Sequence, residues 1–152
     1  MPTLVSQHPD IVVIESFAYN PYPFAEGALT THWLRLASIV DTIKEKLPDA
    51  KIVIAATIAP NEQVFGDGAL NWDQIGKAQK VRTIKNYLDN AVGFAKGEHL
   101  PLADAYHASL DSADNGKLAY INPGDHIHYS DAGRALFANV VANAIASNRL
   151  LE

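Results

Sequence analysis

The chain has 152 residues, of which 48% are apolar and 19% are charged, so it is expected to fold as one domain over residues 1–152. Its 12 basic and 17 acidic residues give a net charge of −5 without a basic patch, which argues against binding to nucleic acid. There is no cysteine, which excludes disulfides and a cysteine nucleophile.

The chain begins with a short segment that leads into an apolar strand. Residues 2–10 are typical of the end of a helix, which Pro9 interrupts. Ile11–Ile14 is an uninterrupted β-branched run and predicts a strand buried on both faces, as in a parallel sheet. Pro21 and Pro23 then enforce a loop.

The rest of the chain alternates between helices and strands. Residues 28–47 carry apolar side chains at alternating steps of four and three, which predicts a helix packed along one face. The elements expected after it are a strand over 52–58, a helix from about Trp72 to Gly97, a short strand over 100–104 and a last helix over about 131–148. Right-handed crossovers between such elements give an α/β fold with a parallel sheet covered on both faces.

No apolar run is long enough to cross a membrane, and the residues after Met1 show no signal-peptide pattern. We therefore expect a soluble protein, in the cytoplasm or secreted from a longer parent. Neither a GxGxxG nor a GxxxxGK[ST] motif is present, so no cofactor is predicted.

An Asp-x-x-His motif, Asp125 to His128, lies on the loop before the last helix. Pro123 and Gly124 keep this loop out of regular structure. At this spacing the carboxylate can fix one imidazole tautomer and leave the other ring nitrogen free to accept a proton. Ser130 is expected to cap the helix that follows, which would hold the pair on a rigid element.

The same loop also permits metal binding. In an extended backbone His126 and His128 would share one face, and Asp125 or His107 could complete a metal site. The sequence leaves this alternative open beside the acid–base pair.

Further candidate residues follow the first strand. The amide of Asn20 could donate to a developing oxyanion, although an Asx turn before Pro21 is the structural alternative. Tyr19 and Tyr129 are candidates for lining a substrate pocket near Asn20 and His128. All these residues belong to the carboxyl end of the expected sheet, where α/β proteins bind ligands.

Two segments of the chain resemble the SGNH/GDSL hydrolases. Pro9–Asn20, a strand that leads to Ala-Tyr-Asn, is similar to the third sequence block of this family, which ends in Gly-x-Asn-Asp. Asp125–Gly133 resembles the fifth block, an Asp-x-x-His motif followed by a helix that starts with small residues. Ala18 stands where the family has glycine, and Pro21 where it usually has aspartate. The resemblance covers nearly the whole chain.

This resemblance implies a three-layer, flavodoxin-like fold and hydrolysis of a small-molecule carboxylic ester through an acyl-enzyme. It implies that His128 is the general base, that Asp125 orients it, and that Asn20 is an oxyanion-hole donor. The family's Gly-Asp-Ser nucleophile block is not found in this sequence. The chain is therefore expected to lack the first two strands of the family's sheet. None of its seven serines lies in a nucleophile-like turn, and Ser16 is the nearest substitute.

Without those two strands, the strand at residues 11–14 would be an exposed apolar edge, which predicts a homodimer through this edge. The leading hypothesis is an esterase or lipase-like hydrolase. The alternatives are a non-catalytic binding or assembly module on the same fold, and a metal-dependent hydrolase that uses Asp125, His126 and His128.

Overall fold

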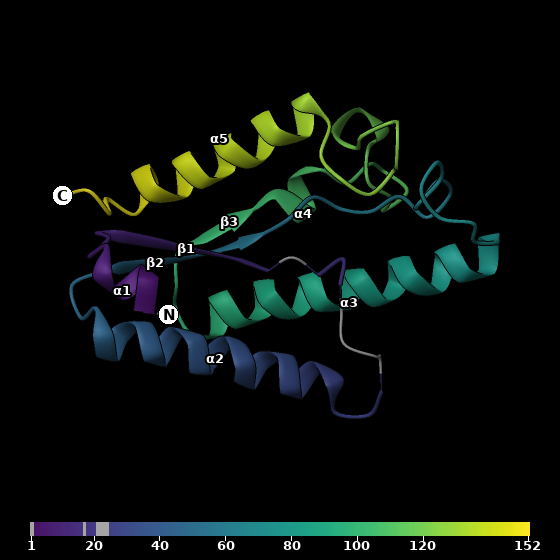
Figure 1. Ribbon diagram of the computed structural model, residues 1–152. Helices are drawn as coiled ribbons and strands as arrows, with labels where there is room; N and C mark the ends of the chain where they lie inside the picture. The colour runs from purple at the N-terminus through teal and green to yellow at the C-terminus, as the bar shows by residue number, and fades with distance from the viewer. Residues whose placement is uncertain (1, 17, 21–24) are drawn as a thin grey trace.

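The computed structural model describes residues 2–16, 18–20 and 25–152 and forms three layers (Figure 1). A parallel sheet lies between α5 on one side and α1, α2 and α3 on the other. The elements are α1 (Pro2–Ser6), β1 (Ile11–Ser16), α2 (Ala28–Lys46), β2 (Lys51–Ala56), α3 (Gln74–Gly97), β3 (Leu102–Asp104), α4 (Ala105–Ala108), the 3₁₀-helix η1 (Leu118–Tyr120) and α5 (Asp131–Ser147). The predicted proline loop at Pro21 and Pro23 lies outside the described residues.

The three strands pair in parallel in the order β1-β2-β3. Val12 is opposite Ile52 in the first pair, and Ile54 is opposite Leu102 in the second. The central strand β2 is buried on both faces, and Val53 and Ile54 are 0% exposed. The α/β class and the parallel sheet are therefore confirmed, with three strands in the described residues.

Strand β1 differs from the prediction that it is buried on both faces. Val12 and Ser16 are buried, but Val13 is 39% exposed and Glu15 is also exposed. The cause is its position, because among the described strands β1 pairs with β2 alone and is an edge. Of its side chains, Ile11 is the one that packs into the cluster beneath α5.

The layer of α2 and α3 follows the predicted periodicity. Leu36, Val40 and Ile43 of α2 are buried, as their steps of four and three require. Trp33 of the same helix meets Phe94 of α3 edge to face, with ring centroids 5.2 Å apart. Burial of each such side chain contributes about 1.5–3 kcal/mol, so the two helices are firmly fixed on the sheet.

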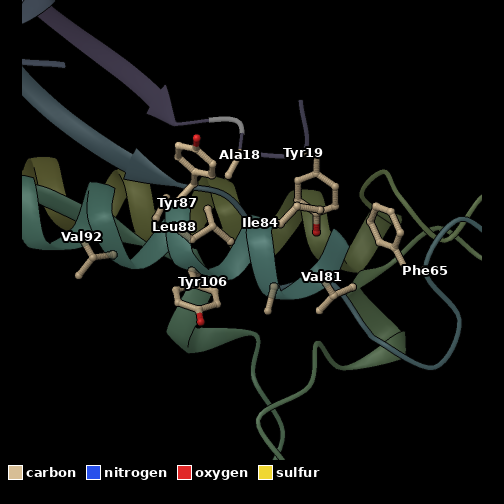
Figure 2. Close-up of a cluster of buried hydrophobic side chains, with 11 residues drawn as sticks. Ala18, Tyr19, Phe65, Val81, Ile84, Tyr87, Leu88, Val92 and Tyr106 are labelled. Atoms are coloured by element: carbon tan, nitrogen blue, oxygen red, sulfur yellow. The ribbon is translucent and has the colours of Figure 1, made fainter. Parts of the chain in front are cut away.

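A second cluster fills this layer near the carboxyl ends of the strands (Figure 2). Ile84 and Leu88 of α3 are 0% exposed and lie beside Tyr19, Phe65 and Tyr106. The loops that follow β1 and β2 are therefore anchored in the core. These buried side chains fix the loops at the carboxyl ends of the strands, where a site is expected.

Helix α5 begins as the sequence predicts. The Ser130 hydroxyl oxygen accepts a hydrogen bond from the Gly133 amide at 3.0 Å, which is an N-cap. The backbone of Gly133 packs directly on η1, since a methyl group added there would lie 2.1 Å from the Tyr120 carbonyl oxygen. A side chain at this position would displace the start of α5.

The Gly133→Ala variant tests this close approach. We expect the substitution to lower the free energy of unfolding by about 1–3 kcal/mol, because the added methyl group overpacks the contact. Gly93→Ala is the matched control, since its nearest neighbour would be 3.7 Å away and it lies inside α3. That variant should be neutral or up to about 1 kcal/mol more stable. Urea unfolding measures both, and equal effects would contradict the packing argument.

Candidate active site

The loop that carries the Asp-x-x-His motif is fixed to the carboxyl ends of β1 and β2. The Tyr129 hydroxyl group donates to Glu15 Oε1 at 2.7 Å and also hydrogen-bonds to Thr57. The Tyr129 ring packs on Phe137 of α5, with centroids 5.5 Å apart. Burial, together with the nearby carboxylate of Glu15, raises the pKa of Tyr129 despite the opposing bond from Thr57. The phenol therefore stays protonated as a donor.

Asp125 and His128 form a hydrogen-bonded pair on this loop. Asp125 Oδ2 lies 2.8 Å from His128 Nδ1. The second carboxylate oxygen, Oδ1, accepts the backbone amides of Ile127 at 2.8 Å and His128 at 3.0 Å. The contact to Nδ1 favours the tautomer with its proton there, which leaves Nε2 with a lone pair. Among the described residues, no hydrogen bond to Nε2 is found, and the His128 side chain is 63% exposed.

The surroundings of Asp125 keep its carboxylate ionised. Partial burial acts to raise its pKa, but the amides of His128 and Ile127 and the His128 side chain together outweigh this effect. The net result is a pKa of about 2. Asp125 is therefore an anion at neutral pH and can stabilise a positive charge on the His128 ring.

Asn122 organises the loop, a role that we did not predict from the sequence. Its backbone amide donates to the His128 carbonyl at 2.8 Å, and its side-chain oxygen accepts the Gly124 amide at 2.8 Å. Its own carbonyl accepts the His126 amide at 2.8 Å. The signal in the sequence is the Asn-Pro-Gly turn, in which the asparagine side chain bonds to the backbone two residues on.

The geometry of His126 differs from the extended backbone expected for a metal-binding pair. His126 has a φ of 52°, so it does not share an extended face with His128. Its Nδ1 lies 2.9 Å from the Asp67 carbonyl oxygen, to which it donates, while the His128 ring turns to Asp125. Within residues 2–16, 18–20 and 25–152 no group of three His, Cys, Asp or Glu residues could hold a metal ion. The metal site predicted from Asp125, His126, His128 and His107 does not form there.

A second Asp–His pair, which the sequence analysis missed, follows β3. Asp104 Oδ2 lies 2.8 Å from His107 Nδ1, and Asp104 Oδ1 accepts the His107 amide at 3.0 Å. The signal was the same Asp-x-x-His spacing. The pair differs in its other nitrogen, because His107 Nε2 lies 3.8 Å from a carboxylate oxygen of Asp89. His107 therefore has a carboxylate near each ring nitrogen, whereas His128 Nε2 has no such neighbour among the described residues.

Asn20 lies by a separate pocket of about 260 Å³ on the α2 side of β1. Ser16, His32 and Arg35 also line it, whereas neither Asp125 nor His128 does. Glu15 also lines this pocket and accepts the Tyr129 hydroxyl group, so the pocket reaches the residue next to His128 without including the Asp–His pair itself.

Tyr19 lies in the core rather than at a pocket mouth. It is 4% exposed, and its hydroxyl group donates to the Ile58 carbonyl at 3.1 Å. A side chain this buried offers almost no surface to a substrate, so the structure favours a structural role for Tyr19. Tyr129 is half-buried, with its hydroxyl group held between Glu15 and Thr57.

The serines give His128 no hydroxyl partner within the part of the chain that the structure describes. Ser130 is the helix cap, and its hydroxyl donates to the Ala119 carbonyl at 2.6 Å. Ser109 is fully buried and bonds to the backbone of Ala59 and Tyr106. Ser16 is 6% exposed and opens on the pocket of Asn20.

Comparison with solved structures identifies the fold. A GDSL-like lipase from Bacteroides thetaiotaomicron superposes with a TM-score of 0.66 at 15% identity, over 95% of this chain and 66% of the lipase. A predicted acylhydrolase from Bacteroides fragilis gives a TM-score of 0.65 at 20% identity, over 95% of this chain and 65% of the other. A predicted GDSL-like lipase from Parabacteroides merdae gives 0.62 at 22% identity, over 93% and 62%.

The chain has an SGNH/GDSL hydrolase-like fold, which confirms the resemblance seen in its sequence. It spans 62–66% of the length of these structures. Protein-family models and curated proteins give no match to the sequence. At these identities the likeness establishes the fold, and activity is a separate question. No helix in the described residues combines the length and apolar character needed to cross a membrane.

The Asp125→Asn variant tests the low pKa of this carboxyl. A pKa of about 2 in the folded chain, against the ordinary 3.8, stabilises the fold above about pH 4 and is lost as the pH falls towards 2. We expect wild type to exceed Asp125→Asn in free energy of unfolding at about pH 5, where the carboxyl group is ionised in both the folded and the unfolded chain. The margin should then shrink between about pH 4 and pH 2.

Urea unfolding at a series of pH values measures this margin. Asp41→Asn, at an exposed position of α2, is the control and should show a smaller change. A margin for Asp125→Asn that is the same at every pH would show that the hydrogen bonds to the carboxylate do not hold it ionised.

Proposed function

We propose that this chain is a carboxylic ester hydrolase in which Asp125 and His128 are the acid–base pair. The observation that carries the proposal is the geometry of His128, whose Nδ1 is held by an ionised carboxylate, while the side chain is 63% exposed and Nε2 has no hydrogen bond among the described residues. Such an imidazole can accept a proton at one nitrogen while the other nitrogen stabilises the resulting charge. The fold shared with GDSL-like lipases supports the same reaction class.

The chemistry divides into two proton transfers. His128 Nε2 takes the proton of an attacking hydroxyl group as its oxygen bonds to the ester carbonyl carbon. The protonated ring then gives that proton to the alcohol oxygen as the ester bond breaks, and Asp125 stabilises the ring while it is charged. The amide of Asn20 would donate to the oxyanion, and one such donor is worth about 2.7–4 kcal/mol. No described serine hydrogen-bonds to His128, and the attacking hydroxyl group is therefore left unassigned.

A non-catalytic binding module on the same fold is the second candidate. The observation that favours it is that no described serine hydroxyl lies within hydrogen-bond reach of His128. A fluorophosphonate probe separates the two candidates. Stoichiometric labelling of a serine would exclude the binding module, whereas turnover without labelling would point to an attacking water.

Substitution of the two histidines tests the esterase proposal. We expect His128→Ala to lower turnover of p-nitrophenyl acetate by about 10²–10⁴-fold, the usual contribution of a general base. His107→Ala is the matched control, because His107 has the same contact to an aspartate but its Nε2 faces Asp89. That variant should keep wild-type turnover. Thermal unfolding should first show that both variants are folded. Equal activity of His128→Ala and wild type would then contradict the proposal.

We also propose that two copies associate through the outer edge of β1. This edge has no strand partner in the described residues, and Val13 on it is 39% exposed. Unpaired backbone groups beside apolar side chains are a template for strand addition, and a two-fold axis closes such a pair.

Sedimentation velocity at several protein concentrations tests this association. Val13→Lys should shift the protein to the monomer, since a charge on an edge strand opposes pairing. Leu118→Lys, at a side chain 55% exposed on η1, is the control and should leave the dimer intact. A monomeric wild type at all concentrations would contradict the proposal.

A further inference from the structure

Large apolar side chains are exposed in the short segment that leads into α3. Of the eight such side chains exposed in the part of the chain that the structure describes, three belong to residues 70–76. Leu70 and Trp72 are each 40% exposed and Ile75 is 68% exposed. We call residues 70–76 the apolar tip. Isolated exposed apolar residues need no explanation, but three within six positions indicate a contact surface.

The apolar tip is held on a rigid base. Phe65 is 2% exposed, and its ring lies 6.0 Å from that of Trp72. The Leu70 amide donates to the Gly66 carbonyl at 2.7 Å. Asp73 caps α3 by accepting the Gly76 amide at 2.8 Å. The exposure of these side chains therefore belongs to the folded chain and does not come from a frayed end.

The base of the apolar tip is bonded to the loop of the Asp–His pair. His126 Nδ1 donates to the Asp67 carbonyl at 2.9 Å, and the Gly66 amide donates to the His126 carbonyl at 3.5 Å. The backbones also touch, since a methyl group on Gly68 would lie 2.3 Å from the Gly124 carbonyl oxygen. The base of the tip is therefore joined to the loop that carries Asp125 and His128.

The chemistry of the tip fits a lipid–water interface. The tryptophan ring combines an apolar body with a polar N–H, a combination that favours the headgroup level of a membrane. Beside it is an open hollow of about 440 Å³, lined by Asn71, Trp72, Asp73 and Gly76. The charged side chains beside the apolar tip do not favour binding to an anionic surface. Asp73 is acidic, and the positive charge of Lys77 is paired with Asp67. The net charge of −5 opposes anionic lipids as well.

We propose that the apolar tip docks this protein onto a zwitterionic lipid surface by inserting Trp72 with Leu70 and Ile75. The binding does not depend on ester hydrolysis. Its consequence for the substrate does rest on the proposed function, because docking would present ester bonds of an aggregated, lipid-like substrate to His128.

Fluorescence of Trp72 with phosphatidylcholine vesicles tests the docking. The chain has two tryptophans, and Trp33→Phe leaves Trp72 as the one reporter. Vesicles should shift its emission to shorter wavelength and carry the protein with them in sedimentation, in low and high salt alike. Trp72→Ala and Ile75→Ser should each weaken co-sedimentation, the former by about tenfold or more. Leu34→Ala is the control, since Leu34 is 62% exposed on α2, and should bind as wild type does.

Three results would overturn the docking. The first is the absence of both spectral shift and co-sedimentation with phosphatidylcholine vesicles. The second is an equal loss of binding in Leu34→Ala. The third is a shift that depends on protein concentration without vesicles, which would assign the tip to a second copy of the chain. His128→Ala should bind vesicles as wild type does. Docking and ester hydrolysis are therefore tested independently, and either proposal can fail without the other.

Discussion

The hydroxyl group of Tyr129 joins the candidate site to the sheet, and the arrangement of the loop depends on it. It donates to Glu15 at the end of β1 and hydrogen-bonds to Thr57 just after β2. A half-buried phenol without partners would cost free energy, so both strands must end in register for the loop to dock. The next residue, Ser130, caps α5, and this helix packs on one face of the sheet. These two hydrogen bonds therefore join the Asp–His loop to the ends of β1 and β2, directly before the start of α5.

The two Asp–His pairs show that spacing alone does not determine chemistry. In both, an aspartate caps the backbone three residues on and contacts Nδ1 at 2.8 Å. The difference comes from neighbours far away in sequence, since Asp89 of α3 approaches His107 while His128 keeps an open nitrogen. A motif of four residues specifies the local hydrogen bonds, and tertiary packing decides which groups surround the second ring nitrogen.

The sequence predicts features that depend on nearby residues of the chain well. It predicts poorly the features that depend on contacts between residues far apart in the sequence. The stripe of α2, the Ser130 cap and the parallel sheet follow from periodicity and local hydrogen bonding, and all three are confirmed. The burial of β1 could not be predicted, because β1 and the fully buried β2 have the same kind of β-branched run and differ in their number of neighbours. The direction of the His126 ring depends on a φ of 52°, which no pattern of residue types indicates. The burial of Tyr19 depends on its contact with Ile58, 39 positions away.

The open edge of β1 lies between the two parts of the candidate site. Side chains alternate along a strand, so Glu15 points to the face that α5 covers and Ser16 to the face of α2. Glu15 is bonded to Tyr129, the neighbour of His128, and both Glu15 and Ser16 line the pocket of Asn20. Glu15, at the carboxyl end of β1, is therefore in contact both with the loop of His128 and with the pocket of Asn20. A strand that paired in parallel with the free edge of β1 would end at this place. In the described residues, the unpaired edge of β1 and the exposed His128 side chain therefore lie at the same end of the sheet, so a partner on that edge would be placed beside the proposed base.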